Sequence, residues 1–226
     1  MREHHVARPI SDSARSLLWG GLIGPVLFVT VFVVLGVVRP GYEPLRHQVS
    51  YLSLGDGGWI QAASFIVTGV PVFAFAVGLR RVLTGGVGSV GTPVAVGVAG
   101  AGLLIAGVFP TTPAFGFPPG TPNAFPGDIP PSAYVHVVGA VAFFGGLIAA
   151  PLVMARRFRR TGERGWAAIS ILSAGAVFLF FVGSSADPSG QPFAPAWAGL
   201  LQRLAIMAGF GWMAVIAGSI LRGQSS

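Results

Sequence analysis

The sequence predicts an all-α, polytopic membrane protein built as a compact bundle of six transmembrane helices. Three observations lead to this fold class. The 226 residues are 53% hydrophobic and only 9% charged, whereas an ordinary soluble domain has about 25% charged residues. Uncharged runs recur along the chain, each long enough to cross about 30 Å of hydrocarbon. The arginines stand between these runs and gather on alternate connections.

Six apolar runs are the predicted spans, at residues 17–38, 59–79, 90–109, 133–154, 165–183 and 197–221, and only the last contains a charged residue, Arg203. The chain then divides into an N-terminal tail, residues 1–16, a transmembrane domain, residues 17–221, and a C-terminal tail, residues 222–226. The first run is too long for a signal-peptide core and lacks a small-x-small cleavage site, so we expect it to be retained. Small residues at helix-packing spacing, such as Gly20 and Gly24 or Ala142 and Gly146, favour a compact bundle.

The arginines predict the orientation, because cytoplasmic loops carry an excess of Lys and Arg. All 14 basic residues are arginine. One side of the predicted bundle holds Arg2, Arg8, Arg15, Arg80, Arg81, Arg156, Arg157, Arg159, Arg160, Arg164 and Arg222. The opposite side holds only Arg39 and Arg46. We therefore predict a multi-pass plasma-membrane protein with both termini in the cytoplasm.

Composition also excludes several classes of function. The net charge of +7 does not indicate nucleic-acid binding, because the arginines lack the interleaved aromatic residues of a nucleic-acid groove and their positions follow topology. The chain has no cysteine, which excludes disulfides, thiolate metal sites and cysteine nucleophiles. We expect membrane lipids as partners and no nucleic acid.

The first outer loop carries a polar stretch, residues 39–56, with the sequence RPGYEPLRHQVSYLSLGD. Pro44 suits the first turn of a helix and Gly55 suits a left-handed cap, so we predict a short interfacial helix over residues 44–54. At 100° per residue its apolar stripe, which we expect to be buried, consists of Leu45, Val49 and Leu52. The other side of this helix would present polar side chains.

The second outer loop, residues 110–132, is rich in proline and glycine. Such a segment does not form a helix, and it is long for a bare connection between neighbouring spans. We expect it to fold back over the outer mouth of the bundle as a lid, with Phe115, Phe117 and Phe125 turned inward. The alternative is a disordered loop, which its composition also allows.

Polar side chains near the predicted outer face form a candidate ligand site, which consists of Arg46, His47, Ser50, Ser53, Asp56, His136, Asp187 and Arg203. Arg203 lies about 9 Å inside the last span at 1.5 Å per residue. Ionisable residues at such depth usually face the bundle interior and have a partner. We expect the partner of Arg203 to be Asp187, with Asp56 as the second choice. The alternative is that its stem snorkels to the headgroups.

Catalytic and cofactor interpretations have weaker support. A zinc hydrolase needs three or more ligands, but only His47 and His136 are available on this side, so Asp56 or Asp187 would have to complete the set. A Ser-His-Asp triad of a loop serine, His136 and Asp187 has no nucleophile-elbow pattern around it. A haem bound by the two imidazoles is disfavoured because both lie near the surface. We therefore expect no metal and no cofactor.

Four features together are familiar: the stretch RPGYEPLRHQVSYLSLGD, GVFPTTP ending the third span, His136 opening the fourth, and GLLQR opening the sixth. In these features the chain resembles the bacterial and archaeal six-helix membrane family catalogued as domain of unknown function 998, itself similar in layout to the Frag1/DRAM/Sfk1 membrane proteins. The resemblance covers nearly the whole chain and implies the six-helix fold, but the family has no assigned activity.

The sequence departs from that family pattern at two positions. The pattern often has an acid directly after the first loop serine and an Asp in an FPTDP motif, whereas Tyr51 and Thr112 stand there in this chain. The loss of these carboxylates weakens any metal or carboxylate mechanism that the resemblance would imply.

We therefore expect a non-enzymatic membrane bundle whose outer-face polar pocket binds a lipid headgroup or a small anionic ligand, in order to transport or sense it. Two alternatives stay open at this point. One is a membrane enzyme, a hydrolase or transferase, that acts on outer-leaflet lipids. The other is a structural or assembly subunit.

Overall fold

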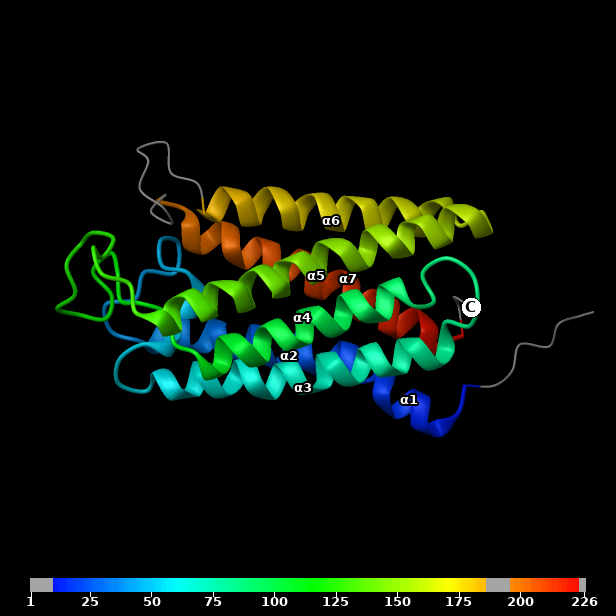
Figure 1. Cartoon of the computed structure of the whole chain (residues 1–226), viewed down its shortest axis with the longest axis horizontal. Helices are drawn as coiled ribbons and strands as arrows, with labels where there is room; N and C mark the ends of the chain where they lie inside the picture. Colours follow the sequence, from blue (N-terminus) through cyan, green and yellow to red (C-terminus); the bar gives the residue numbers. More distant parts are fainter. Residues whose placement is uncertain (1–9, 186–195, 224–226) are drawn as a thin grey trace, which may run out of the picture.

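The described residues of the chain, 10–185 and 196–223, form an all-helical bundle in the computed structural model (Figure 1). Its elements are α1 (Asp12–Leu18), α2 (Gly20–Val38), the 3₁₀ helix η1 (Val49–Ser53), α3 (Gly58–Val82), α4 (Gly91–Val108), α5 (Pro131–Thr161), α6 (Arg164–Ser185) and α7 (Ala198–Leu221). Six helices are long and apolar enough to cross a membrane, with α1 and α2 counted as one. The predicted fold class is thereby confirmed, and the chain is a multi-pass membrane protein.

The observed helices follow the predicted spans, with differences at two ends. The first span begins earlier than expected, at Asp12, because Ser11 accepts a hydrogen bond from the backbone of Ala14 and caps an extra helix there. The chain then turns at Trp19 into α2. The fourth span continues past residue 154 to Thr161, since nothing interrupts the helix before Gly162 takes a left-handed conformation.

Each long helix packs against the next one in the chain, and α2 also packs against α7, so the six spans close into a ring. The short helix α1 lies against α3. In Figure 1, α1 and the last turn of α7 lie at the same end of the bundle. We call this the arginine end, because Arg80, Arg81, Arg156 and Arg157 lie there, and we call the opposite end the loop end. That the arginine end faces the cytoplasm stays a prediction.

Glycines let α4 and α5 approach until their backbones touch. A Cβ atom on Gly102 would lie 2.5 Å from the Gly139 carbonyl oxygen, and one on Gly146 would lie 2.5 Å from that of Ala95. Real Cβ atoms do not come this close to backbone, so larger residues would force these helices apart. The prediction of close packing at small residues holds at this interface.

Phenylalanines from different helices meet in the middle of the ring. The Phe28 ring of α2 lies 5.2 Å from that of Phe65 in α3 and 5.8 Å from that of Phe210 in α7. The Phe143 ring of α5 lies 5.5 Å from the ring of Phe210. These four side chains are all buried. They form a central aromatic cluster that separates the arginine end from the loop end.

Candidate functional site

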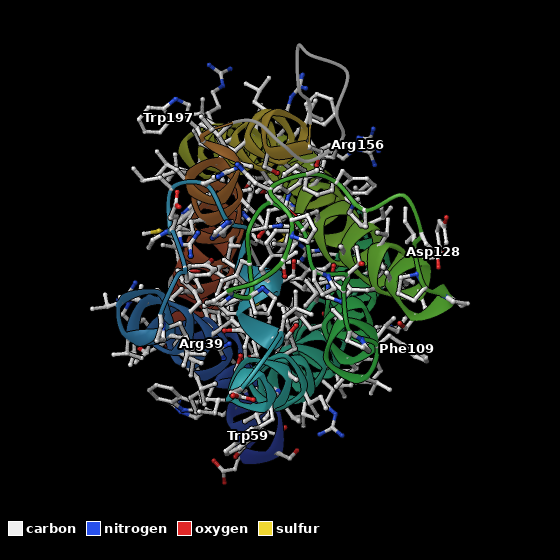
Figure 2. The ribbon with its side chains drawn as sticks, turned by 90° about the vertical axis from the view of Figure 1, so that its left-hand side faces the viewer. Arg39, Trp59, Phe109, Asp128, Arg156 and Trp197 are labelled. Carbon is white, nitrogen blue, oxygen red and sulfur yellow. The ribbon has the colours of Figure 1, made fainter. Side chains whose placement is uncertain are left out.

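The segment between α2 and α3, residues 39–57, lies across the middle of the ring at the loop end (Figure 2). The prediction of a helix over residues 44–54 is wrong: only η1 is helical, and it is a 3₁₀ helix of five residues. Val49 and Leu52 are buried as predicted, at 1% and 0% exposure, but Leu45 is 51% exposed.

The segment is not helical because its carbonyl groups have other partners. The backbone N–H groups of Gly199 and Leu200, in the first turn of α7, donate to the carbonyls of Arg46 and Leu45 at 3.0 and 2.9 Å. These N–H groups have no partner within their own helix, so the segment caps α7. A Cβ atom on Gly199 would lie 2.3 Å from the His47 carbonyl oxygen, and this contact therefore requires glycine.

Arg203 fastens the same segment to α7. Its guanidinium donates to the carbonyl oxygens of Pro44 (2.6 Å), His47 (3.1 Å) and Gly199 (2.9 Å) and to the Tyr42 hydroxyl. The cation also lies over the rings of Phe32 and Tyr42, at 5.6 and 5.4 Å from their centroids. Carbonyl dipoles and aromatic rings thus compensate the desolvation free energy of this cation in α7.

An acidic partner for Arg203 is not found among the described residues. Asp56 is exposed and is not among the groups that contact Arg203, so the second choice of partner is wrong. Asp187, the first choice, lies outside the described residues.

His47 uses both ring nitrogens to hold the loops together. Its Nδ1 accepts the backbone N–H of Glu43 at 3.0 Å, so its Nε2 carries the proton and donates to the Phe115 carbonyl at 3.0 Å. Burial lowers the pKa of His47, against an opposing effect of the bond to Phe115. The imidazole is therefore neutral and saturated, and it has no lone pair left for a metal or for proton transfer.

The Pro-rich loop folds back over this segment, as the lid prediction requires. Phe115 and Phe117 are buried and Phe125 is half-buried against the core. Arg39 packs over the Phe117 ring, 5.6 Å from its centroid, and donates to the carbonyl of Leu54. The loop is thus an ordered cover on the loop end.

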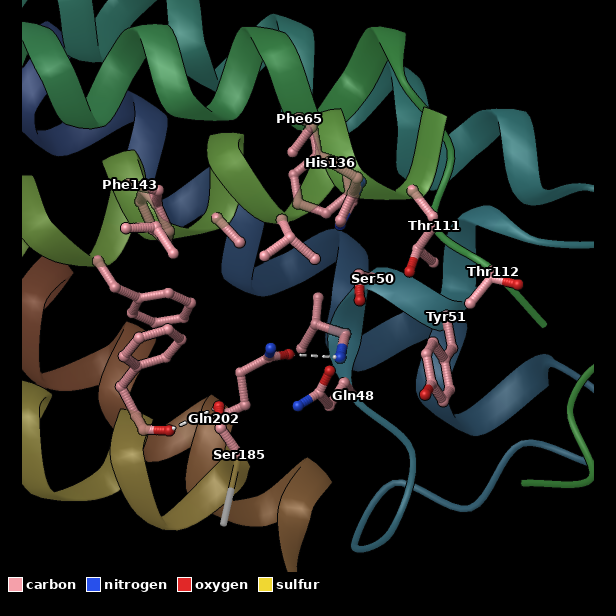
Figure 3. Close-up of a pocket in the computed structure, with 18 of the residues that line it drawn as sticks. Gln48, Ser50, Tyr51, Phe65, Thr111, Thr112, His136, Phe143, Ser185 and Gln202 are labelled. Atoms are coloured by element: carbon pink, nitrogen blue, oxygen red, sulfur yellow. Dashed lines mark hydrogen bonds between the residues drawn. The ribbon is translucent and has the colours of Figure 1, made fainter. Parts of the chain in front are cut away.

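Beneath this cover lies a cavity of about 600 Å³ (Figure 3). It is lined by residues of η1, of the helices α2 to α7 and of the Pro-rich loop at residues 110–132, and three members of the central aromatic cluster, Phe28, Phe65 and Phe143, form its floor. Its apolar lining includes Phe65, Val137, Val141, Phe143, Phe144, Phe181, Val182 and Ile206. Its polar lining consists of Gln48, Ser50, Tyr51, Thr111, Thr112, Tyr134, His136, Ser185 and Gln202. None of the described residues that line it is charged.

The polar groups are held at the loop end of the cavity. Gln48 donates to the Ser184 carbonyl at 3.1 Å, and Gln202 accepts the backbone N–H of Val49 at 2.7 Å. In Figure 3 these two amides lie across the cavity from Phe65 and His136. The hydroxyls of Ser50, Tyr51 and Thr111 make no hydrogen bond with any other described residue. Burial raises the pKa of Tyr51, which keeps its phenol neutral.

His136 also lines the cavity, and one hydrogen bond fixes its proton. Its Nδ1 lies 2.8 Å from the Phe109 carbonyl oxygen, which can only accept, so Nδ1 carries the proton. In the neutral form of the ring, Nε2 is then an acceptor. His136 is 4% exposed and its ring meets the Phe65 ring edge-on at 6.2 Å.

The cavity opens sideways between α5 and α6. Val137 and Val141 on α5 and Val182 on α6 line it, yet they are 42%, 55% and 45% exposed. Nearer the arginine end, Phe144 and Phe181 stack with their centroids 4.2 Å apart and close the same helix pair. The opening therefore lies in the outer flank of the bundle, where a membrane protein meets lipid.

The chain matches the family described as "Protein of unknown function (DUF998)" over residues 22–219, which takes in all of α3 to α6 and nearly all of α2 and α7. It belongs to this family. No curated protein and no solved structure matches the chain. The resemblance expected from the sequence motifs is thereby confirmed.

In this DUF998 protein two of the motifs that carry the resemblance, GLLQR and the stretch at residues 39–56, face each other. The GLLQR motif supplies the α7 side of the contact, through Gly199, Gln202 and Arg203, and the stretch at residues 39–56 supplies the other side. The two positions at which the sequence departs from the family pattern, Tyr51 and Thr112, both line the cavity.

The structure brings together only two of the predicted site residues at the cavity, Ser50 and His136. The others have different places: Arg203 and His47 hold the segment at residues 39–57, Arg46 donates to Asn123, Ser53 donates to the Ser50 carbonyl at 2.6 Å, Asp56 is exposed, and Asp187 lies outside the described residues. The apolar lining on α5 and α6 was not among the predicted residues. In the sequence, the apolar residues of α5 and α6 that line the cavity cannot be distinguished from apolar residues that face lipid, so no sequence pattern identifies them.

Proposed function

We propose that this DUF998 protein binds a membrane lipid in the cavity at the loop end. An acyl chain lies against Phe143, Phe144 and Phe181, and the ester or hydroxyl groups where chain and headgroup join reach Ser50 and Thr111. The observation that carries the proposal is the sideways opening of an apolar cavity with hydroxyl groups at one end.

The size and position of the cavity support a lipid as the ligand. Pockets of about 300 to 1,000 Å³ accommodate one drug-sized group, and the cavity has about 600 Å³. Val141 lies about 15 Å along α5 from its first residue at 1.5 Å per residue. The opening therefore reaches the depth of the hydrocarbon chains, which can enter without crossing water.

The sequence suggested a lipid headgroup or a small anionic ligand. The described lining residues of the cavity are uncharged, and they favour an uncharged part of a lipid over an anion. A buried anion needs a cation or several donors in direct contact, and no described arginine lines the cavity. Hydroxyl and amide groups can bond the uncharged ester region of a lipid. The charged part of the headgroup would remain outside the opening.

The test fills the cavity and measures the lipid that remains bound. Ala140 lines the cavity and is half-buried on α5, whereas Val138 lies on the same helix, 62% exposed and outside the lining. We expect Ala140→Phe to retain much less phospholipid than the unchanged protein after a stringent detergent wash. Val138→Phe is the matched control and should retain the same amount. Native mass spectrometry counts the lipids bound to each protein.

Equal retention by Ala140→Phe and Val138→Phe, with both proteins folded by circular dichroism, would contradict the proposal. It would mean that the retained lipid lies on the outer surface of the bundle rather than in the cavity.

A further inference from the structure

A second groove lies at the arginine end, on the opposite side of the central aromatic cluster from the cavity. It runs between the turn from α1 to α2 and the last turns of α7, and has a volume of about 470 Å³. Its lining consists of Arg15, Trp19, Leu22, Ala214, Val215, Gly218, Leu221 and Arg222.

The fold creates this groove by breaking the first span at Trp19. The chain turns there, so α1 lies mainly against α3 and makes only a small contact with α7. On α7 the groove is bordered by the small residues Ala214 and Gly218. A Cβ atom on Gly218 would meet only the guanidinium of Arg222, at 3.8 Å. The floor is therefore shallow, apolar and open toward the flank of the bundle.

Two cations lie at the membrane-surface end of this apolar floor. Arg15 and Arg222 are both exposed, and neither guanidinium has an acidic or hydrogen-bonding side-chain partner among the described residues. Trp19 lies beside them at 48% exposure, in a position where an indole would sit at the headgroup level of a membrane. Such a site combines positive charge at the level of lipid phosphates with an apolar groove at the level of the chains.

We infer that this groove binds one anionic phospholipid, with its phosphate between Arg15 and Arg222 and one acyl chain along Ala214 and Gly218. Two arginines can each donate charge-assisted hydrogen bonds to phosphate oxygens. The apolar floor favours a lipid over a free anion, because an acyl chain buries apolar surface in the groove and a soluble phosphate has no such chain. This site shares no residue with the cavity and does not depend on the function proposed for it.

The test compares lipids and charge variants by native mass spectrometry of the full chain. The probes are phosphatidylglycerol and phosphatidylcholine with the same chains, added to delipidated protein. We expect Arg15→Gln with Arg222→Gln to lower retention of phosphatidylglycerol by about tenfold or more, since this pair removes the charge-assisted hydrogen bonds to the phosphate in the groove. Arg159→Gln with Arg160→Gln removes the same charge from exposed positions at the same end and should retain the lipid.

A third variant tests the apolar part of the site without changing charge. Gly218→Leu fills the floor, where only the movable Arg222 side chain is near, and should also lower retention of phosphatidylglycerol. The inference is overturned if the two double variants retain the lipid equally, if phosphatidylcholine binds as well, or if Gly218→Leu has no effect. Inorganic phosphate that raises the melting temperature as much as phosphatidylglycerol does would show a site for free anions instead. Ala140→Phe should leave this binding intact, which separates it from the cavity.

Discussion

Arg203 is a predicted ligand-binding residue that has a structural role in the fold. Its guanidinium donates hydrogen bonds to carbonyl groups of the segment at residues 39–57, and Arg203 does not line the cavity. The polar groups that it satisfies would lose their partner if the guanidinium were removed. Arg203 therefore has a structural role: it holds the segment at residues 39–57 against α7 and does not contact a ligand in the cavity.

We therefore expect Arg203→Met to destabilise the protein by about 3 kcal/mol, because it leaves several carbonyl groups without a donor. Thermal unfolding in detergent measures this loss. Arg80→Met is the control, since Arg80 is exposed at the other end of the bundle, and should change stability little. If Arg203→Met unfolds like the unchanged protein but no longer retains lipid, Arg203 is a ligand contact and the structural assignment is wrong.

His47 makes stability depend on pH at the same place. Burial lowers its folded-state pKa below the ordinary value of 6.5, so below about pH 6.5 the unfolded chain binds more protons than the folded one. Stability should be complete above that pH and should fall as the pH drops toward the folded-state pKa. Protonation would also place a proton on Nδ1, where it would repel the Glu43 N–H that Nδ1 accepts in the neutral ring.

A variant separates His47 from the other histidines. In His47→Gln the amide can accept from Glu43 and donate to Phe115 without titrating. We expect the melting temperature of this variant to vary less between pH 7 and pH 5 than that of the unchanged protein. An identical pH dependence in both proteins would show that His47 does not cause it.

At the scale of elements, the sequence predicted the long helices and missed the local structure between them. Long apolar runs specify spans because every backbone group in hydrocarbon must be bonded within its own helix. The segment at residues 44–54 has helical signals, but its carbonyls accept hydrogen bonds from the start of α7, more than 150 residues later. Periodicity cannot detect such a distant partner. For the same reason His47 and Arg203 looked available when they are not.

The contact between this segment and α7 has its own test at Gly199. We expect Gly199→Ala to destabilise the protein by about 2 kcal/mol, because its Cβ atom would lie 2.3 Å from the His47 carbonyl oxygen. Gly211→Ala is the matched control in the same helix. Nothing lies within 4 Å of its Cβ position, so the change should stabilise α7 by about 0.5 to 1 kcal/mol. Equal melting temperatures for the two variants would contradict the tight contact.

At the scale of the whole molecule, the ring of helices has two chemically different ends. The arginine end carries most of the positive charge, and the loop end carries the cavity and its cover. The arginine distribution predicts that the loop end faces outward. The cavity would then take lipid from the outer leaflet, and the groove at Arg15 and Arg222 would take lipid from the inner one.

Cysteine labelling tests this orientation directly, since the chain has no cysteine of its own. We expect Ser132→Cys, at the start of α5, to react with an impermeant thiol reagent on intact cells. Ser225→Cys, beyond the end of α7, should react only after the membrane is permeabilised. Labelling of Ser225→Cys alone on intact cells would reverse the orientation.

The occupancy of the cavity is the central claim, and photo-crosslinking from the lipid side measures it. A phosphatidylethanolamine with a photoreactive group on its acyl chain would be incorporated into membranes that contain the protein, irradiated and mapped by peptide mass spectrometry. We predict crosslinks to Phe143, Phe144 or Phe181, and their loss in Ala140→Phe but not in Val138→Phe. Crosslinks confined to outward-facing residues such as Leu172 and Leu179, equal in all three proteins, would contradict a lipid-binding cavity.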